Sequence, residues 1–97
     1  MSRPLRLIAA PAHWTRRGEG RTTFYAGIKD GLITPPLATS ARSKRWPDYE
    51  ADVLIAARIA GLTDDEIRAL VIKLEAARPQ LLSRLQIARG AIVEDVT

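Results

Sequence analysis

Glycine and proline residues interrupt this chain of 97 residues at short intervals, so its helices must be short and separated by turns. The main interruptions are Gly18, Gly31, Pro35-Pro36, Pro47, Gly61 and Pro79. A chain of this length forms about one domain with a thin core. The pattern therefore predicts a small, mainly α-helical fold.

The segment before Gly18 predicts one short helix. Residues 5–10 form a brief apolar lead-in. Pro11 suits the first turn of a helix that runs to about Arg17, because proline has no amide hydrogen to lose there. Trp14 is expected to be its inward-facing anchor, and Gly18 ends it.

A second helix is expected from about Gly20 to Lys29. Phe24 and Ile28 stand four residues apart and so share one face, while the polar residues point elsewhere. Asp30-Gly31 closes this helix, since glycine adopts the left-handed cap conformation readily. Two helices of this size joined through a glycine match a helix-turn-helix, whose second helix enters the DNA major groove.

A small β-hairpin is expected after the second helix. Pro35-Pro36 cannot continue a helix and belongs at a sheet edge or in an extended connection. Residues 40–43 are small and polar enough for a tight turn between short strands near Leu37 and at residues 44–46. This hairpin would form a wing beside the helix-turn-helix, with cations at its tip.

The second half of the chain predicts three more helices. The first begins at Pro47-Asp48, where acidic residues complement the positive helix end, and ends at Gly61. Its expected apolar stripe comprises Ala51, Leu54, Ile55 and Ile59. The second begins with a capping box at residues 63–66. The third follows Pro79, carries Leu81, Leu82, Leu85 and Ala88, and ends at Gly90, leaving residues 91–97 as a loose tail.

Apolar residues advance by threes and fours through these last two helices, as in helix pairs and coiled coils. The candidate contact residues are Ile67, Leu70, Leu74, Leu81 and Leu85. Either the two helices fold back as a hairpin or they supply a contact between protomers. The expected organisation is a DNA-binding unit in residues 1–60 and a helical extension in residues 61–90.

Charge is distributed unevenly along the chain, which carries a net +4. Residues 1–47 hold nine basic and two acidic residues, whereas residues 48–97 hold six basic and nine acidic residues. A cationic front joined to a mildly acidic back is typical of a polyanion-binding face with a separate packing or assembly element. The alternative is ordinary solvated surface charge.

Catalytic chemistry has little support in this sequence. It has no cysteine, and His13 is its only histidine, so a cysteine metal site and a paired nucleophile and base are both lacking. His13 is expected at the helix surface or partly packed. We expect no enzyme activity, no metal and no cofactor. The absence of cysteine and of an apolar run long enough for a membrane favours a cytoplasmic protein.

A set of motifs follows in a fixed order between Arg6 and Ile59: Arg6-Leu7-Ile8, Pro11, Gly18, Arg21-Thr22-Thr23-Phe24-Tyr25, Asp30-Gly31, Pro35-Pro36, Arg42 to Trp46 and Glu50. Through these residues the chain resembles AlpA-like regulators and phage-type excisionases, which are small MerR-like winged helix-turn-helix proteins. The chain departs from the pattern at His13, Glu19 and Gly20. The segment from Ile59 to Arg78 is similar to an extension that some members carry.

The resemblance implies a winged helix that binds repeated sites in double-stranded DNA, bends the DNA, and directs an integrase toward excision or regulates transcription. It places Arg21, Thr22, Thr23 and Tyr25 on the recognition helix, and Arg42, Ser43, Lys44 and Arg45 on the wing. Arg16, Arg17 and Lys29 are expected to contact the DNA backbone. Alternatives are a promoter-binding regulator without a recombination role, and an adaptor that binds an integrase or host regulator through its C-terminal helices.

Overall fold

The computed structural model describes residues 5–84, and within them three short strands and five helices follow one another. Their order and bounds are β1 (Leu7–Ile8), α1 (Ala10–Arg16), α2 (Arg21–Lys29), β2 (Leu37–Ala38), β3 (Lys44–Pro47), α3 (Asp48–Ile59), α4 (Asp64–Ala77) and α5 (Gln80–Arg84). The mainly α-helical composition confirms the prediction.

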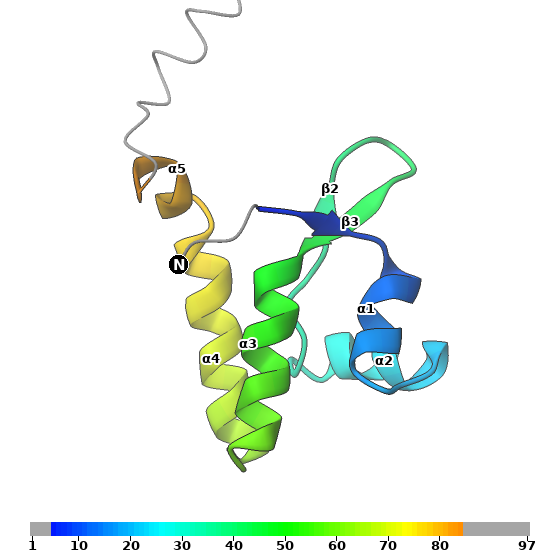
Figure 1. Cartoon of the computed structure of the whole chain (residues 1–97), viewed down its shortest axis with the longest axis vertical. Helices are drawn as coiled ribbons and strands as arrows, with labels where there is room; N and C mark the ends of the chain where they lie inside the picture. The colour runs from blue at the N-terminus through cyan, green and yellow to red at the C-terminus, as the bar shows by residue number, and fades with distance from the viewer. Residues whose placement is uncertain (1–4, 85–97) are drawn as a thin grey trace, which may run out of the picture.

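A three-stranded antiparallel sheet joins the two ends of the first half of the chain, with the strand order β1-β3-β2. The β2–β3 pairing places Leu37 opposite Arg45 and confirms the expected hairpin. The third strand was not expected. It arises within the apolar lead-in, where Ile8 pairs with Trp46 and Leu7 with Pro47, and it fixes the start of α1 beside the hairpin (Figure 1).

Helices α1 and α2 are joined through Gly18, whose φ of +72° is the left-handed conformation that glycine tolerates. Both helices begin within one residue of the expected position. Trp14 is partly buried and packs against the core, as expected. The prediction for His13 is wrong, however, because this residue is fully buried. The imidazole ring lies edge-on between Phe24, at 4.9 Å, and Trp46, at 5.6 Å, where an aromatic ring completes the core.

Two groups of buried side chains hold these elements together. The first group joins α1, α2 and the sheet through Phe24, Ile33 and Trp46. The second lies between α3 and α4 and comprises Leu54, Ala57, Ile67 and Val71. Since α3 follows β3 directly, the second group continues from the first, and α3 and α4 lie side by side along one flank (Figure 1).

The apolar stripe predicted for α3 is buried in part, with an exception at its C-terminal end. Ala51 and Leu54 are buried as expected, but Ile59, in the last turn of α3, is 82% exposed. It borders a surface groove together with Ile55, Arg17 and Glu19, and is not part of the cluster between α3 and α4. Thr63 forms the expected capping box at the start of α4. The predicted extension of the last helix through Leu85 and Ala88 to Gly90, and the predicted tail, lie outside the described residues. No helix in residues 5–84 is long and apolar enough to span a membrane.

Candidate nucleic-acid interface

Helix α2 presents a polar face to solvent because its apolar residues are used in the core. Phe24 is fully buried and Ile28 is partly buried, whereas the polar residues of the helix are exposed. The exposed positions include Arg21, Thr22, Thr23, Tyr25 and Lys29. The guanidinium carbon of Arg21 lies 5.9 Å from the centre of the Tyr25 ring, so cation–π attraction favours placing this charge beside the ring.

The β2–β3 hairpin projects on the same side of the molecule as α1 and α2, away from α4 and α5 (Figure 1). Its turn is held by Ser40, whose Oγ accepts hydrogen bonds from the backbone amides of Arg42 and Ser43 at 3.4 and 3.1 Å. The amide of Thr39 donates to the carbonyl of Ser43 at 2.9 Å. This turn leaves the Arg42 side chain exposed at the tip.

A groove of about 310 Å³ lies between the hairpin, α2 and the start of α1. It is lined by Tyr25 of α2 and by Arg42, Lys44 and Arg45 of the hairpin. Trp46 also lines it, and no carboxylate does so among the described residues. Residues far apart in the sequence therefore form one cationic groove, whose charges attract a polyanion and whose tyrosine offers a hydroxyl and an aromatic face.

Two of the expected backbone contacts, Arg16 and Arg17, are bonded to carboxylates of the chain itself. Arg16 forms an ion pair with Asp52 of α3. The Arg17 side chain is only 6% exposed, and its Nε donates a hydrogen bond to Glu19 Oε1 at 2.9 Å. These pairs tie α1 to its neighbours. Arg17 is consequently turned away from solvent, while Arg16 stays accessible at the surface.

The base of the hairpin rests on a buried polar chain that sequence reasoning missed. Trp46 Nε1 donates to the Thr34 carbonyl at 2.7 Å, and Thr34 Oγ1 donates to Glu50 Oε1, also at 2.7 Å. Arg78, which caps the end of α4, donates to both Glu50 oxygens and to the Pro35 carbonyl at 2.7 to 2.8 Å. The bonds to Glu50 raise the pKa of Arg78. The only sequence signal was a glutamate in the first turn of an amphipathic helix.

The expected contact residues of the C-terminal half lie mostly within the chain's own fold. Ile67 is 1% exposed and packs against α3, so its side chain belongs to the single-chain core. Leu70 and Leu74 are partly buried on the same cluster. Leu81 of α5 borders a surface groove, and Leu85 lies outside the described residues. Self-association remains a prediction.

The buried His13 is an unusual element so near a cationic surface. Burial lowers its pKa, because the charged imidazolium loses its hydration, and the charges of Arg17 and Arg16 lower it further. The neutral ring therefore serves as an aromatic core residue. Within residues 5–84, no cluster of three or more acidic, histidine or cysteine side chains could hold a metal ion.

Comparison with known proteins gave no match to any family model, any curated protein or any solved structure. The assignment of a role to the cationic groove therefore depends on its residues and their arrangement.

Proposed function

We propose that this chain is a winged helix-turn-helix protein that binds specific sites in double-stranded DNA. In this proposal α1 and α2 form the helix-turn-helix, α2 is the recognition helix, and the β2–β3 hairpin is the wing. The observation that carries the proposal is the groove that Tyr25 of α2 lines together with Arg42, Lys44 and Arg45 of the hairpin, with no carboxylate lining it among the described residues.

The exposed chemistry of α2 suits contact with base edges. The B-DNA major groove is about 12 Å wide and admits one α-helix. Arg21, in the first turn of α2, would donate two hydrogen bonds to guanine O6 and N7, a contact that discriminates by about 1 to 3 kcal/mol against a wrong base. Thr22 and Thr23 offer hydroxyls to bases or phosphates and methyl groups to thymine. Lys29, at the far end of α2, would contact the DNA backbone.

The hairpin suits the neighbouring phosphates or a narrow minor groove, because such sites concentrate negative potential that attracts arginine and lysine. Arg42 and Lys44 are exposed, while Arg45 is half-buried and donates through Nη1 to the Lys44 carbonyl at 3.0 Å. That bond holds the guanidinium along the strand, so Arg45 is positioned before DNA arrives. Ser43 adds a small polar group at the end of the turn.

For the biological role we propose an excisionase, or recombination directionality factor, that assembles on repeated sites, bends DNA and directs an integrase toward excision. The similarity of residues 6–59 to AlpA-like regulators and phage-type excisionases supports this role. A promoter-binding regulator would use the same surface, so the DNA region that is bound decides between the two.

The first experiment is a fluorescence titration of duplexes tiled across the attachment region of the element and across the gene's own promoter, against a random duplex, at two salt concentrations. Tight, stepwise binding to one region, weakening steeply as salt rises, would support a cooperative site-specific protein. Weak and equal binding to all duplexes would contradict the proposal.

Point variants divide the roles of the surface cations. Arg21→Ala should reduce binding to the specific duplex about 10-fold or more, with a smaller effect on random duplex. Lys29→Ala should weaken binding to the specific and the random duplex alike. It should also reduce the slope of log affinity against log salt concentration by about the contribution of one phosphate contact. Arg58→Ala serves as the control, because Arg58 lies at the end of α3 in an exposed ion pair with Asp64. Equal losses for Arg21→Ala and Arg58→Ala would refute the assignment of α2.

A further inference from the structure

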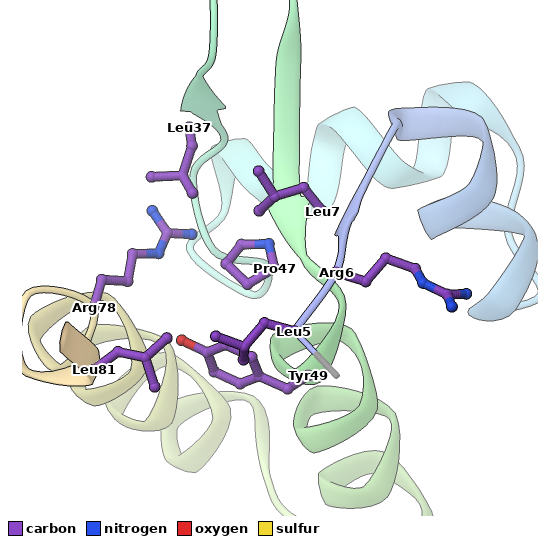
Figure 2. Close-up of a pocket in the computed structure, with 8 residues that line it drawn as sticks. All are labelled: Leu5, Arg6, Leu7, Leu37, Pro47, Tyr49, Arg78 and Leu81. Atoms are coloured by element: carbon purple, nitrogen blue, oxygen red, sulfur yellow. The ribbon is translucent and has the colours of Figure 1, made fainter. Parts of the chain in front are cut away.

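Two apolar grooves lie on the face formed by β1, α3, α4 and α5, and they share Leu5, Tyr49 and Leu81. The first measures about 280 Å³, and the second, which runs along α4 past Leu74 and Ala77, about 380 Å³. Figure 2 shows the first groove, with the side chains of Leu5 and Tyr49 gathered between Leu81 and Pro47. The shared residues make the two grooves one continuous depression.

This depression leaves large aliphatic side chains accessible to solvent. Leu5 is 55% and Leu7 50% exposed, although both are large aliphatic residues close to the sheet. Contiguous apolar surface of this kind marks a place where another segment packs. The depression is separate from the cationic groove, because its lining residues come from the opposite flank of the hairpin and from α4 and α5.

The charged groups at the depression are all basic. Lys73 and Arg84 line the second groove, and both are exposed. Arg78 lines the first groove and is bonded to Glu50 behind it, while the Arg6 side chain points away from the groove (Figure 2). No aspartate or glutamate lines either groove in the part of the chain that the structure describes. The matching occupant is therefore apolar and carries carboxylates.

We propose that residues 92–96 of this same chain occupy the depression. Their sequence, Ile-Val-Glu-Asp-Val, supplies three aliphatic side chains for the Leu5, Tyr49 and Leu81 surface. It also supplies two adjacent carboxylates, Glu94 and Asp95, for the basic groups Lys73 and Arg84. The inference does not depend on DNA binding.

The length of chain between the described part and this segment permits the contact. Arg84 itself borders the second groove. Seven residues separate it from Ile92 in the sequence, and the eight Cα-to-Cα steps between them span up to about 26 Å when the chain is extended. A connection this short gives an effective concentration in the millimolar range, so modest contacts suffice to hold the segment in place.

Disulfide trapping tests the proposal cleanly, because the natural chain contains no cysteine. The test variant combines Val93→Cys with Ala77→Cys, in the lining of the second groove. The control combines Val93→Cys with Ala76→Cys, the same substitution one residue earlier, at an exposed position on α4 that lines neither groove. Both full-length proteins are oxidised at micromolar concentration and analysed on non-reducing gels.

The expected result is an intramolecular disulfide that forms about 10-fold faster in the Ala77→Cys variant than in the Ala76→Cys control. Equal rates would overturn the proposal. A disulfide-linked dimer whose yield rises with protein concentration would also overturn it, since a second copy would then be the occupant. Unfolding followed by tryptophan fluorescence checks that both variants are folded. Slow disulfide formation in a folded variant then reports the distance between the two cysteines and not a loss of structure.

Charge reversal supplies a second, independent readout. Changing both Glu94→Lys and Asp95→Lys in the trapping variant should return the rate to the control value, because like charges would then meet Lys73 and Arg84. Adding Lys73→Glu and Arg84→Glu should restore the faster rate. A rate indifferent to these changes would remove the electrostatic part of the argument and overturn the match between this segment and the depression.

Discussion

Arg78→Met should destabilise the protein more than any change to a surface ion pair, because it leaves Glu50 buried without its counter-charge. Glu50 is fully buried and the Arg78 side chain is 14% exposed. The substitution removes two hydrogen bonds to the carboxylate and a third to the Pro35 carbonyl. Breaking one partner of a buried ion pair costs about 3 to 5 kcal/mol.

The assay is urea unfolding followed by tryptophan fluorescence. Trp46 is a suitable reporter because it is 1% exposed and bonds the Thr34 carbonyl within the same polar chain. With a urea dependence of about 1.5 kcal/mol per molar, a loss of about 4 kcal/mol lowers the midpoint by about 3 M. Such a loss is a large share of the 5 to 15 kcal/mol that is typical of a small domain.

Arg58→Met is the matched control. Its ion pair with Asp64 has a similar N···O distance of 2.8 Å, but both side chains are about half exposed, so the expected cost is below about 1 kcal/mol. Glu50→Gln should cost less than Arg78→Met, because the amide keeps the shape of the side chain and Arg78 retains some access to water. The reasoning fails if Arg78→Met costs no more than Arg58→Met.

Three further predictions concern stability and are measured by the same unfolding assay. Burial lowers the pKa of His13 in the folded state, so below about pH 6.5 the unfolded chain binds more protons than the folded chain. The free energy of unfolding should therefore fall as the pH is lowered from there, by at most about 1.4 kcal/mol per pH unit. A His13→Phe variant whose stability has the same pH dependence between pH 5.5 and 7 would contradict this. Gly31→Ala should lower the free energy of unfolding by about 1 to 2 kcal/mol, because the backbone φ of +78° is unfavourable for alanine. Steric conflict is not the cause, since the added Cβ would lie 3.7 Å from Arg68 Cγ, an ordinary contact distance. Gly31→Asn should lower it less, because asparagine adopts this conformation more readily. Thr63→Ala should cost about 1 kcal/mol through loss of the α4 cap, with Thr63→Ser close to the natural protein; equal losses for both would exclude capping as the cause.

The structure also changes how the C-terminal half should be tested. A truncation after Gly61 would remove Ile67 and Val71 from the core that they share with α3, together with the Arg78 partner of Glu50. Loss of DNA binding in such a variant would report unfolding. Substitutions at exposed positions of α4, such as Ile72, which is 68% exposed, separate assembly from folding.

The sequence by itself determined the local elements, because their signals are local. Gly18 and Gly31 end two helices through backbone conformations that other residues disfavour. Thr63 starts α4 through bonds within a single turn, and the small residues at 40–43 close the hairpin. The candidate DNA surface was predictable to the extent that the charged residues of α2 and the hairpin lie close together in the sequence.

Tertiary structure alone decided which side chains those elements bury and bond. His13 and Glu50 are polar residues that no periodicity assigns to a core, yet both are fully buried, because distant residues supply an aromatic enclosure for one and a guanidinium for the other. Ile59 fits the apolar stripe and is nevertheless exposed, because it lies outside the cluster that α3 and α4 share. Burial depends on what packs opposite, and that partner lies up to 43 residues away in the chain, as between Arg78 and Pro35.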